Sequence, residues 1–387
     1  MSSIQLLREQ KLALISQYTQ PDDSRGLAQV LITLTAIAVL WWLAVASVGV
    51  SRWLTVGAVL ALSLFTLRVF ALMHECGHGS LFRSGRLNRL FGFVLGVVAG
   101  MPQYVWSRHH AYHHAHNGNW QKYRGPYTTR SVNEYNAMTD TQRFMYRGKC
   151  SIGLAPVVGF VYLIFNPRYT WFKGTLSLLS HLFRKKIEQP SLSLREHAAS
   201  FKTRYWQSRK EYWHMFWNNA VLLSAWAVMS WFCGPMVFFS IYVLSVSLAG
   251  GAGIVLFTVQ HNFEHAYASD DEHWDYDRGA INGTSFLILP RLLNWFTANI
   301  GYHHIHHLSP KIPNYCLVEC HNQYRHLFGD VRRVRLSSVH KALQCILWDS
   351  QTRRIISLAE YRTLAFAVPP VAASNGMQTG RARPPVI

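Results

Sequence analysis

Two apolar stretches near the N-terminus decide how this chain folds: LAQVLITLTAIAVLWWLAVASVGV (Leu27–Val50) and WLTVGAVLALSLFTLRVFALM (Trp53–Met73). Each is long enough to cross a bilayer as an α-helix, which takes about 20 apolar residues. Only Ser51 and Arg52 separate them, so the second stretch must return the chain to the side where the first began. The sequence therefore predicts a helical hairpin in a membrane.

A second apolar region, Trp217–Gln260, is too long for one span. The dipeptide Gly234–Pro235 interrupts it and predicts a turn between two further spans. Leu90–Val105 and Ile152–Phe165 are also apolar but short, and we interpret them as interfacial or re-entrant. The four predicted spans are about 27–50, 53–73, 217–232 and 237–259.

Composition agrees with a membrane protein, because half of the 387 residues are apolar and only 15% are charged. We predict an all-α integral membrane protein with four transmembrane helices in two hairpins, a cytoplasmic histidine-rich cap and interfacial helices. A cytoplasmic N-terminal segment (1–26) precedes the membrane domain (27–345). A C-terminal segment (346–387) follows, and we expect it to end in a disordered tail after Pro369.

The distribution of charge predicts the orientation. Between Arg83 and Trp213 the chain has 20 Lys or Arg and 5 Asp or Glu, whereas the two hairpin turns contribute one basic residue. The positive-inside rule then places both termini and this middle segment in the cytoplasm. Its basic and aromatic part, Ser180–Trp213, is typical of a helix lying at the membrane surface.

The formal net charge of +19 also bears on partners. No recognisable nucleic-acid motif accompanies the charge, so a nucleic-acid partner is not expected. A basic cytoplasmic face suits anionic lipid, and it would also attract an acidic electron-donor protein. The six cysteines show no regular spacing, which predicts reduced thiols in a reducing compartment. The oligomeric state is left open.

Thirteen of the twenty histidines gather in four short clusters. Members of a cluster lie three or four positions apart, so on a helix they share one face. Four crossings bring all the clusters to the cytoplasmic side, in agreement with the charge distribution. The ten histidines with this spacing are His74, His78, His110, His113, His114, His261, His265, His303, His306 and His307.

Clustered imidazoles on one side of a membrane indicate a metal site. One pair at i, i+4 would be weak support, but four clusters with the same spacing are strong support. A structural zinc site fits poorly, because it takes four ligands that commonly include cysteine. Ten histidines are enough for two metal ions with four or five nitrogens each.

These motifs resemble those of the membrane-bound fatty acid desaturases, within the wider desaturase–hydroxylase superfamily. The resemblance lies in the boxes HECGH, HHAYHHAH and HHIHH, and in the phrases QHNFEHAY and IPNY, which are similar to the bacterial acyl-lipid branch. It extends over roughly residues 27–324. Members of that family have four membrane helices and use two histidine-bound irons, O2 and electrons to convert CH2–CH2 into cis CH=CH.

The resemblance implies that the ten histidines are iron ligands and that the irons form the oxidant. It also implies an acyl-lipid substrate and a separate electron donor, such as a ferredoxin with its reductase, because the chain has no HPGG haem-binding stretch. A multi-pass location follows, with the bacterial inner membrane expected and the site facing the cytoplasm. His109, His116 and His304 offer alternative registers beside the expected ligands.

Acidic residues near the boxes have two interpretations. Glu75, Glu264, Asp275 and Asp277 could accept hydrogen bonds from the free N–H groups of ligand imidazoles. Alternatively, the loop 269–283 could be solvated and paired with the basic middle segment. Arg68, within a predicted span, is expected to snorkel or to pair with an acid. The seven isolated histidines are interpreted as structural or surface residues.

Other functions remain open at this stage. A hydroxylase of a lipid or alkane, or a carotenoid ketolase, would carry the same histidine boxes. A metal transporter is a remote alternative, because transporters place polar ligands near the bilayer midplane, and these clusters lie beyond the helix ends. The contexts of QHNFEHAY and IPNY favour desaturation.

Overall fold

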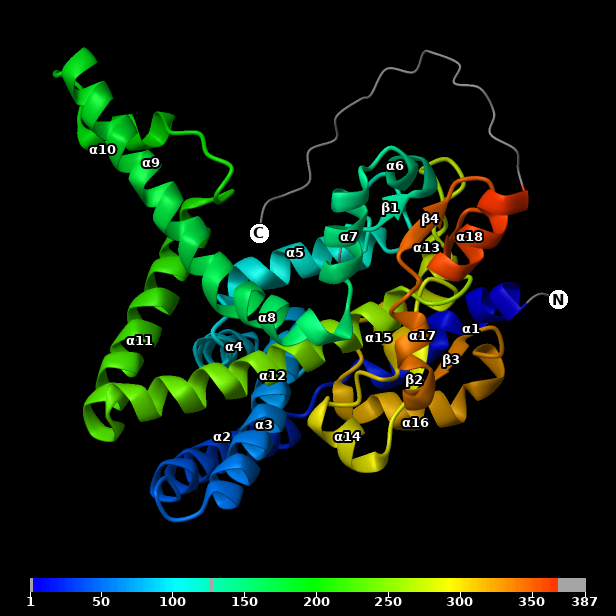
Figure 1. Cartoon of the computed structure of the whole chain (residues 1–387), viewed down its shortest axis with the longest axis horizontal. Coiled ribbons are helices and arrows are strands. Elements are labelled where there is room, and N and C mark those ends of the chain that lie inside the picture. Colours follow the sequence, from blue (N-terminus) through cyan, green and yellow to red (C-terminus); the bar gives the residue numbers. More distant parts are fainter. Residues whose placement is uncertain (1–2, 126–127, 368–387) are drawn as a thin grey trace.

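The computed structural model describes residues 3–125 and 128–367, so the tail after Pro369 lies outside the described residues. Helices dominate, and the few strands form two small sheets. Figure 1 shows the hairpins α2–α3 and α11–α12 at one side of the molecule and a cap of short elements at the other. The prediction of an all-α, multi-helix membrane fold is confirmed.

The first hairpin joins α2 (Asp23–Ala46) to α3 (Arg52–His78). The Asp22 carboxylate accepts hydrogen bonds from two backbone N–H groups and begins α2, as an N-cap does. Helix α3 ends at Gly79, which adopts φ +66°, a conformation that favours glycine. The helix thus continues five residues past the predicted span and carries His74 and His78 on its last turns.

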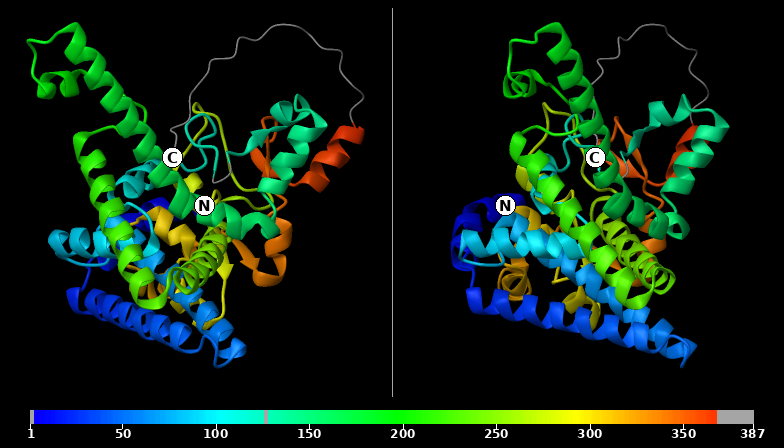
Figure 2. Two further views of the ribbon diagram at one scale, coloured as in Figure 1. Left: turned by 60° about the vertical axis from the view of Figure 1, so that its left-hand side comes forward. Right: turned by 90° about the vertical axis from the view of Figure 1, so that its left-hand side faces the viewer.

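The second hairpin joins α11 (Arg209–Cys233) to α12 (Pro235–His261) at the predicted break. Gly234 has φ +78° and Pro235 opens α12 at a position where its missing N–H costs no hydrogen bond. Helix α12 (yellow-green in Figure 2) packs against α3 (blue), and each helix ends in a histidine, His261 and His78. Their C-terminal ends therefore bring separate histidine clusters together.

Four helical stretches are long and apolar enough to cross a membrane: α2, α3, Ile152–Glu188 and α12. Three of them contain predicted spans. The predicted span 217–232 lies within α11, whose first half contains the polar residues Asn218 and Asn219, and α11 is not among the four. Ile152–Phe165, expected to be only interfacial, belongs instead to the long stretch Ile152–Glu188.

This stretch is longer than the sequence suggested because the helix continues through Pro167. It comprises α8 (Ala155–Phe160), a π-helical turn (Val161–Phe165) and α9 (Asn166–Glu188). Proline leaves the carbonyl four residues earlier, that of Leu163, without its usual N–H donor. The Arg168 guanidinium donates to the Leu163 carbonyl (3.0 Å) and to the Ile164 carbonyl (3.3 Å). These bonds compensate for the missing donor.

Helices α4 (Gly85–Ala99) and α5 (Gln103–His116) are bent by 99° at Gly100–Pro102. The bend agrees with the interfacial or re-entrant interpretation of Leu90–Val105. The prediction of a single helix over Ser180–Trp213 is wrong. The segment contains the end of α9, all of α10 (Leu194–Ser200) and the start of α11. In Figure 1, α9 and α10 form an arm that extends away from the rest of the molecule.

The cap is built from both ends of the chain. Helix α1 (Ser3–Tyr18) packs on C-terminal elements around Leu7, Leu14 and Phe328. Strands β2 (Ser285–Ile288) and β3 (Arg332–Arg335) pair in parallel, while β4 (Leu347–Asp349) pairs with β1 (Arg130–Ser131) and β5 (Arg354–Ile356). The remaining helices are α6 (Val132–Asn136), α7 (Asp140–Lys149), α13 (Tyr276–Ile281), α14 (Arg291–Phe296), α15 (His303–Leu308), α16 (Leu317–Gln323), α17 (Val339–Ala342) and α18 (Leu358–Ala367), with one-turn 3-10 helices at Ile152–Leu154, Asn314–Cys316, Arg325–Leu327 and Leu336–Ser338.

Candidate metal centre

Nine histidines converge between the membrane helices and the cap, and they form two groups. In each group the ligand atoms all lie within 4.8 Å of one another. Eight of the nine residues are buried, and His78 is partly exposed. The five-histidine group contains His74, His78, His110, His114 and His306, and the four-histidine group contains His113, His261, His303 and His307.

Four helices supply these side chains. Helix α3 contributes two, α5 contributes three, α12 contributes one and α15 contributes three. Helices α5 and α15 each serve both groups, because residues three and four positions apart point in slightly different directions on one face. The predicted boxes at His110–His114 and His303–His307 are therefore each divided between two neighbouring sites.

The structure excludes His265 from both groups. Helix α12 ends at His261, and His265 adopts φ +68° in the following loop. Its backbone N–H donates to the Ile355 carbonyl, and its exposed ring contacts Arg354. The prediction that His265 is a ligand assumed a helix through residue 265, and that assumption is wrong.

The alternative registers are also excluded. His304 points away from the metal groups and its Nε2 lies 3.1 Å from Nδ1 of His321. His116 contacts the Tyr112 carbonyl, and His109 is in neither group. The expected members of each box, not their neighbours, come together.

Ring nitrogens of the two groups face one another across short distances. The Nε2 atoms of His261 and His303 lie 2.9 Å apart, and those of His110 and His114 lie 3.0 Å apart. Two neutral imidazoles meeting in this way can form at most one hydrogen bond, and His306 has no partner at either ring nitrogen. Converging lone pairs that lack donors fit a metal ion at the centre of each group.

The protonation state of the α15 histidines also suits metal binding. Burial, reinforced by the neighbouring imidazoles, holds the pKa of His303, His306 and His307 well below the ordinary value. These side chains are thus neutral near pH 7 and present a free lone pair. Metal ligation requires that form of histidine.

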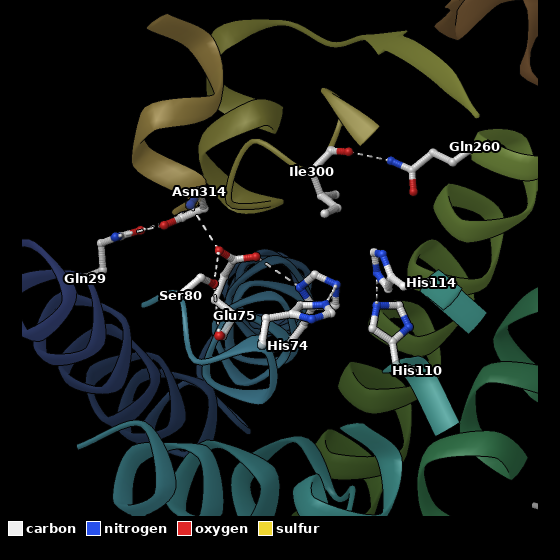
Figure 3. A network of polar contacts seen from close by, with 10 residues as sticks. Gln29, His74, Glu75, Ser80, His110, His114, Gln260, Ile300 and Asn314 are labelled. Atoms are coloured by element: carbon white, nitrogen blue, oxygen red, sulfur yellow. Dashed lines mark hydrogen bonds and ion pairs between the residues drawn. The ribbon is translucent and has the colours of Figure 1, made fainter. Parts of the chain in front are cut away.

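Glu75 lies behind the five-histidine group. The residue is 1% exposed, and its Oε1 accepts from Nδ1 of His74 at 3.1 Å (Figure 3). Such a contact fixes the ring and leaves Nε2 free to face a metal. The prediction that Glu75 supports a ligand agrees with this geometry.

The three other acids that the sequence suggested as supports for the ligands, Glu264, Asp275 and Asp277, do not contact the nine histidines. Asp275 and Asp277 pair with Arg8 and Lys11 of α1 at 2.5 to 3.3 Å, and Asp275 also caps α13. Glu264 is exposed and pairs with Arg332. The alternative interpretation, a loop paired with basic residues, agrees with these contacts. The partners of Asp275 and Asp277 come from the N-terminal helix, whereas Asp271 of the same loop pairs with Lys122 of the basic middle segment at 2.8 Å.

Two aromatic residues at the site were missed in the sequence. The Trp106 ring stacks on His110 with centroids 4.5 Å apart, and its Nε1 donates to the Tyr162 hydroxyl. Phe257 contacts His113 and His261 at 5.2 and 5.0 Å. Both aromatic residues stand four positions before a ligand on the same helix, and this spacing could have identified them.

Comparison with known proteins gives one family match and three relatives. Residues 51–338 match the family model described as fatty acid desaturase. A fatty acid desaturase of Bacillus subtilis (strain 168) is 31% identical over 357 residues, which is 92% of each chain. An endoplasmic-reticulum omega-3 fatty acid desaturase of Vigna radiata is 26% identical, over 68% of this chain and 63% of its own. A chloroplastic sn-2 acyl-lipid omega-3 desaturase (ferredoxin) of Arabidopsis thaliana is 25% identical, over 68% and 54%.

Proposed function

The chain belongs to the fatty acid desaturase family of oxidoreductases, and on that premise we propose that it uses O2 to introduce a cis double bond into the fatty acyl chain of a membrane lipid. The observation that carries the proposal is the pair of buried histidine groups. We propose two iron ions as the metals, because imidazole ligands suit iron and oxygen-dependent chemistry.

The chemistry explains the need for a metal. An acyl methylene has no acidic proton and no leaving group, so side-chain acids and bases cannot act on it. Iron would supply the activation of O2. The histidines would hold the metals. Trp106 packs its ring against His74 and His110, and Phe257 packs against His113 and His261, which limits the access of water.

The reaction requires a partner that donates electrons. One CH2–CH2 unit, one O2, two electrons and two protons give one CH=CH and two waters. We propose a separate acidic carrier such as a ferredoxin with its reductase, since the chain carries a net charge of +19 and a relative is named as ferredoxin-dependent. We also propose that the protein lies in a bacterial inner membrane, with the metal site on the cytoplasmic side.

Lipid analysis tests the proposal. The chain is expressed in a host that lacks desaturases, and total fatty acids are compared by gas chromatography and mass spectrometry with those of cells expressing His307→Ala. A new species two mass units lighter, absent with the variant, is expected. A species sixteen mass units heavier would identify a hydroxylase, and metal uptake into vesicles without lipid change would identify a transporter; either result would overturn the proposal.

A further inference from the structure

Arg68 is a buried cation inside the membrane helix α3. Its residue is 2% exposed, and the guanidinium plane lies 3.8 Å from the centre of the Trp295 ring. It donates to the Thr33 hydroxyl (3.1 Å), to Oε1 of Gln29 (3.1 Å) and to the Trp295 carbonyl. Arg68 therefore neither snorkels nor forms an ion pair with any of the described acids, contrary to both expectations from the sequence.

Glu75, two turns further along α3, is the opposite case. It is a buried anion with no Lys or Arg in salt-bridge contact among the described residues. Besides His74, its carboxylate accepts hydrogen bonds at Oε2 from the Ser80 hydroxyl and from the backbone N–H of Asn314, both at 3.0 Å. Burying a charge is costly unless hydrogen bonds or an opposite charge compensate for it. The side chains that lie between Arg68 and Glu75 are therefore important for both residues.

Two side-chain amides connect these charges. Nδ2 of Asn314 donates to Oε1 of Gln29 at 2.8 Å, and Nε2 of Gln29 donates back to Oδ1 of Asn314 at 3.3 Å. The same Gln29 oxygen accepts from Arg68. Figure 3 shows the resulting line of contacts from Gln29 through Asn314 and Glu75 to His74. The members come from α2, α3 and the cap, and they are far apart in the sequence.

We propose that Arg68, Gln29 and Asn314 are positioning residues that hold the Glu75 carboxylate against His74 and thereby strengthen metal binding at the five-histidine group. The inference rests on the proposed metal centre. Arg68 draws the Gln29 carboxamide into one orientation, Gln29 orients Asn314, and the Asn314 backbone fixes Glu75. The packing of α2 on α3 is thus coupled to one metal site and not to the other.

The four-histidine group provides the contrast within the same chain. Among the described residues no carboxylate contacts its four imidazoles, whereas Glu75 contacts His74. Nδ1 of His113, His261 and His303 has no hydrogen-bond partner there, as is also the case for His114 and His306 of the five-histidine group. Gln260, a buried amide next to His261, donates to the Ile300 carbonyl, and Figure 3 shows no interaction between it and the histidines drawn. Gln260→Leu therefore removes a buried glutamine of the same size without affecting the line to His74.

Titration with cobalt(II) tests the inference without relying on activity. The purified, metal-free full chain is titrated while the visible absorption of bound cobalt is recorded. His261→Ala removes the step of the four-histidine group and thereby identifies the step that belongs to the five-histidine group. We expect Gln29→Leu to weaken that step by about 10-fold, within the range for supporting residues, and to shift its absorption band. The binding step of the four-histidine group should stay unchanged, and this result would also show that the variant is folded.

The controls separate this inference from the proposed function. Gln260→Leu should leave the five-histidine step as in the wild type, and Asn314→Ala should weaken it. A Gln29→Leu protein that binds both ions as the wild type does, or that weakens both equally, overturns the inference. A wild-type protein that binds no metal would instead contradict the proposed function.

Discussion

The two histidine groups look equivalent in the sequence but differ in the structure. The five-histidine group has one more ligand and a buried carboxylate behind His74, whereas no carboxylate of the part of the chain that the structure describes contacts the four-histidine group. The two groups should therefore differ in how well they tolerate the loss of a ligand. The five-histidine group can lose one imidazole and still hold an ion with four. The four-histidine group would be left with three.

Removing one ligand from each group gives the largest expected effect. His307→Ala should lower product formation by at least about 100-fold, the upper end of the range for supporting residues, since a direct ligand is lost. Bound iron should fall from two ions per chain to one. His306→Ala should retain more activity and iron. Equal loss in both variants, measured by lipid analysis and iron content, would contradict the proposed difference between the groups.

Removing the carboxylate should have the next largest effect. Glu75→Gln keeps the size of the side chain but removes the negative charge that orients His74, and should weaken metal binding at the five-histidine group by about 10- to 100-fold. Glu75→Asp should restore part of the affinity. Isothermal titration of the metal-free protein measures both, and an unchanged affinity in Glu75→Gln would show that the contact at 3.1 Å has no role in binding.

Acidity should affect both groups through α15, which contributes to each. Burial lowers the pKa of His303, His306 and His307, so below about pH 6.5 the unfolded chain binds more protons than the folded, metal-free one. The free energy of unfolding should therefore be highest above pH 6.5 and fall as the pH decreases from there. Thermal unfolding of the metal-free protein at pH 7.5 and 5.5 measures this; an equal or higher melting temperature at pH 5.5 would be inconsistent with neutral, buried imidazoles.

The smallest effect is expected at His265, the histidine that the sequence pairs with His261. It is exposed, lies outside both groups and contacts Arg354. His265→Ala should change activity by less than about 2-fold, as for a surface substitution, while His261→Ala should lose the ion of the four-histidine group. Loss of metal in the His265→Ala variant would show that His265 is a ligand after all.

The sequence predicts the features that depend on local spacing better than those that depend on tertiary contacts. Apolar length and helical spacing identified α2, α3 and α12 and nine histidines that converge, because each signal is local. The failures depend on tertiary contacts. The end of α12 at His261 and the continuation of a helix through Pro167, compensated by Arg168, cannot be derived from local spacing. The same is true of the ion pairs between α1 and Asp275, and of the link from Gln29 to Asn314.

The central claim is that two metal ions are held by two separate histidine groups. X-ray diffraction from crystals of the iron-loaded protein, recorded on both sides of the iron absorption edge, tests it most directly. We predict two anomalous peaks, one among His74, His78, His110, His114 and His306 and the other among His113, His261, His303 and His307. A single peak, or a peak centred on His265 or on the Asp275 loop, would contradict the account.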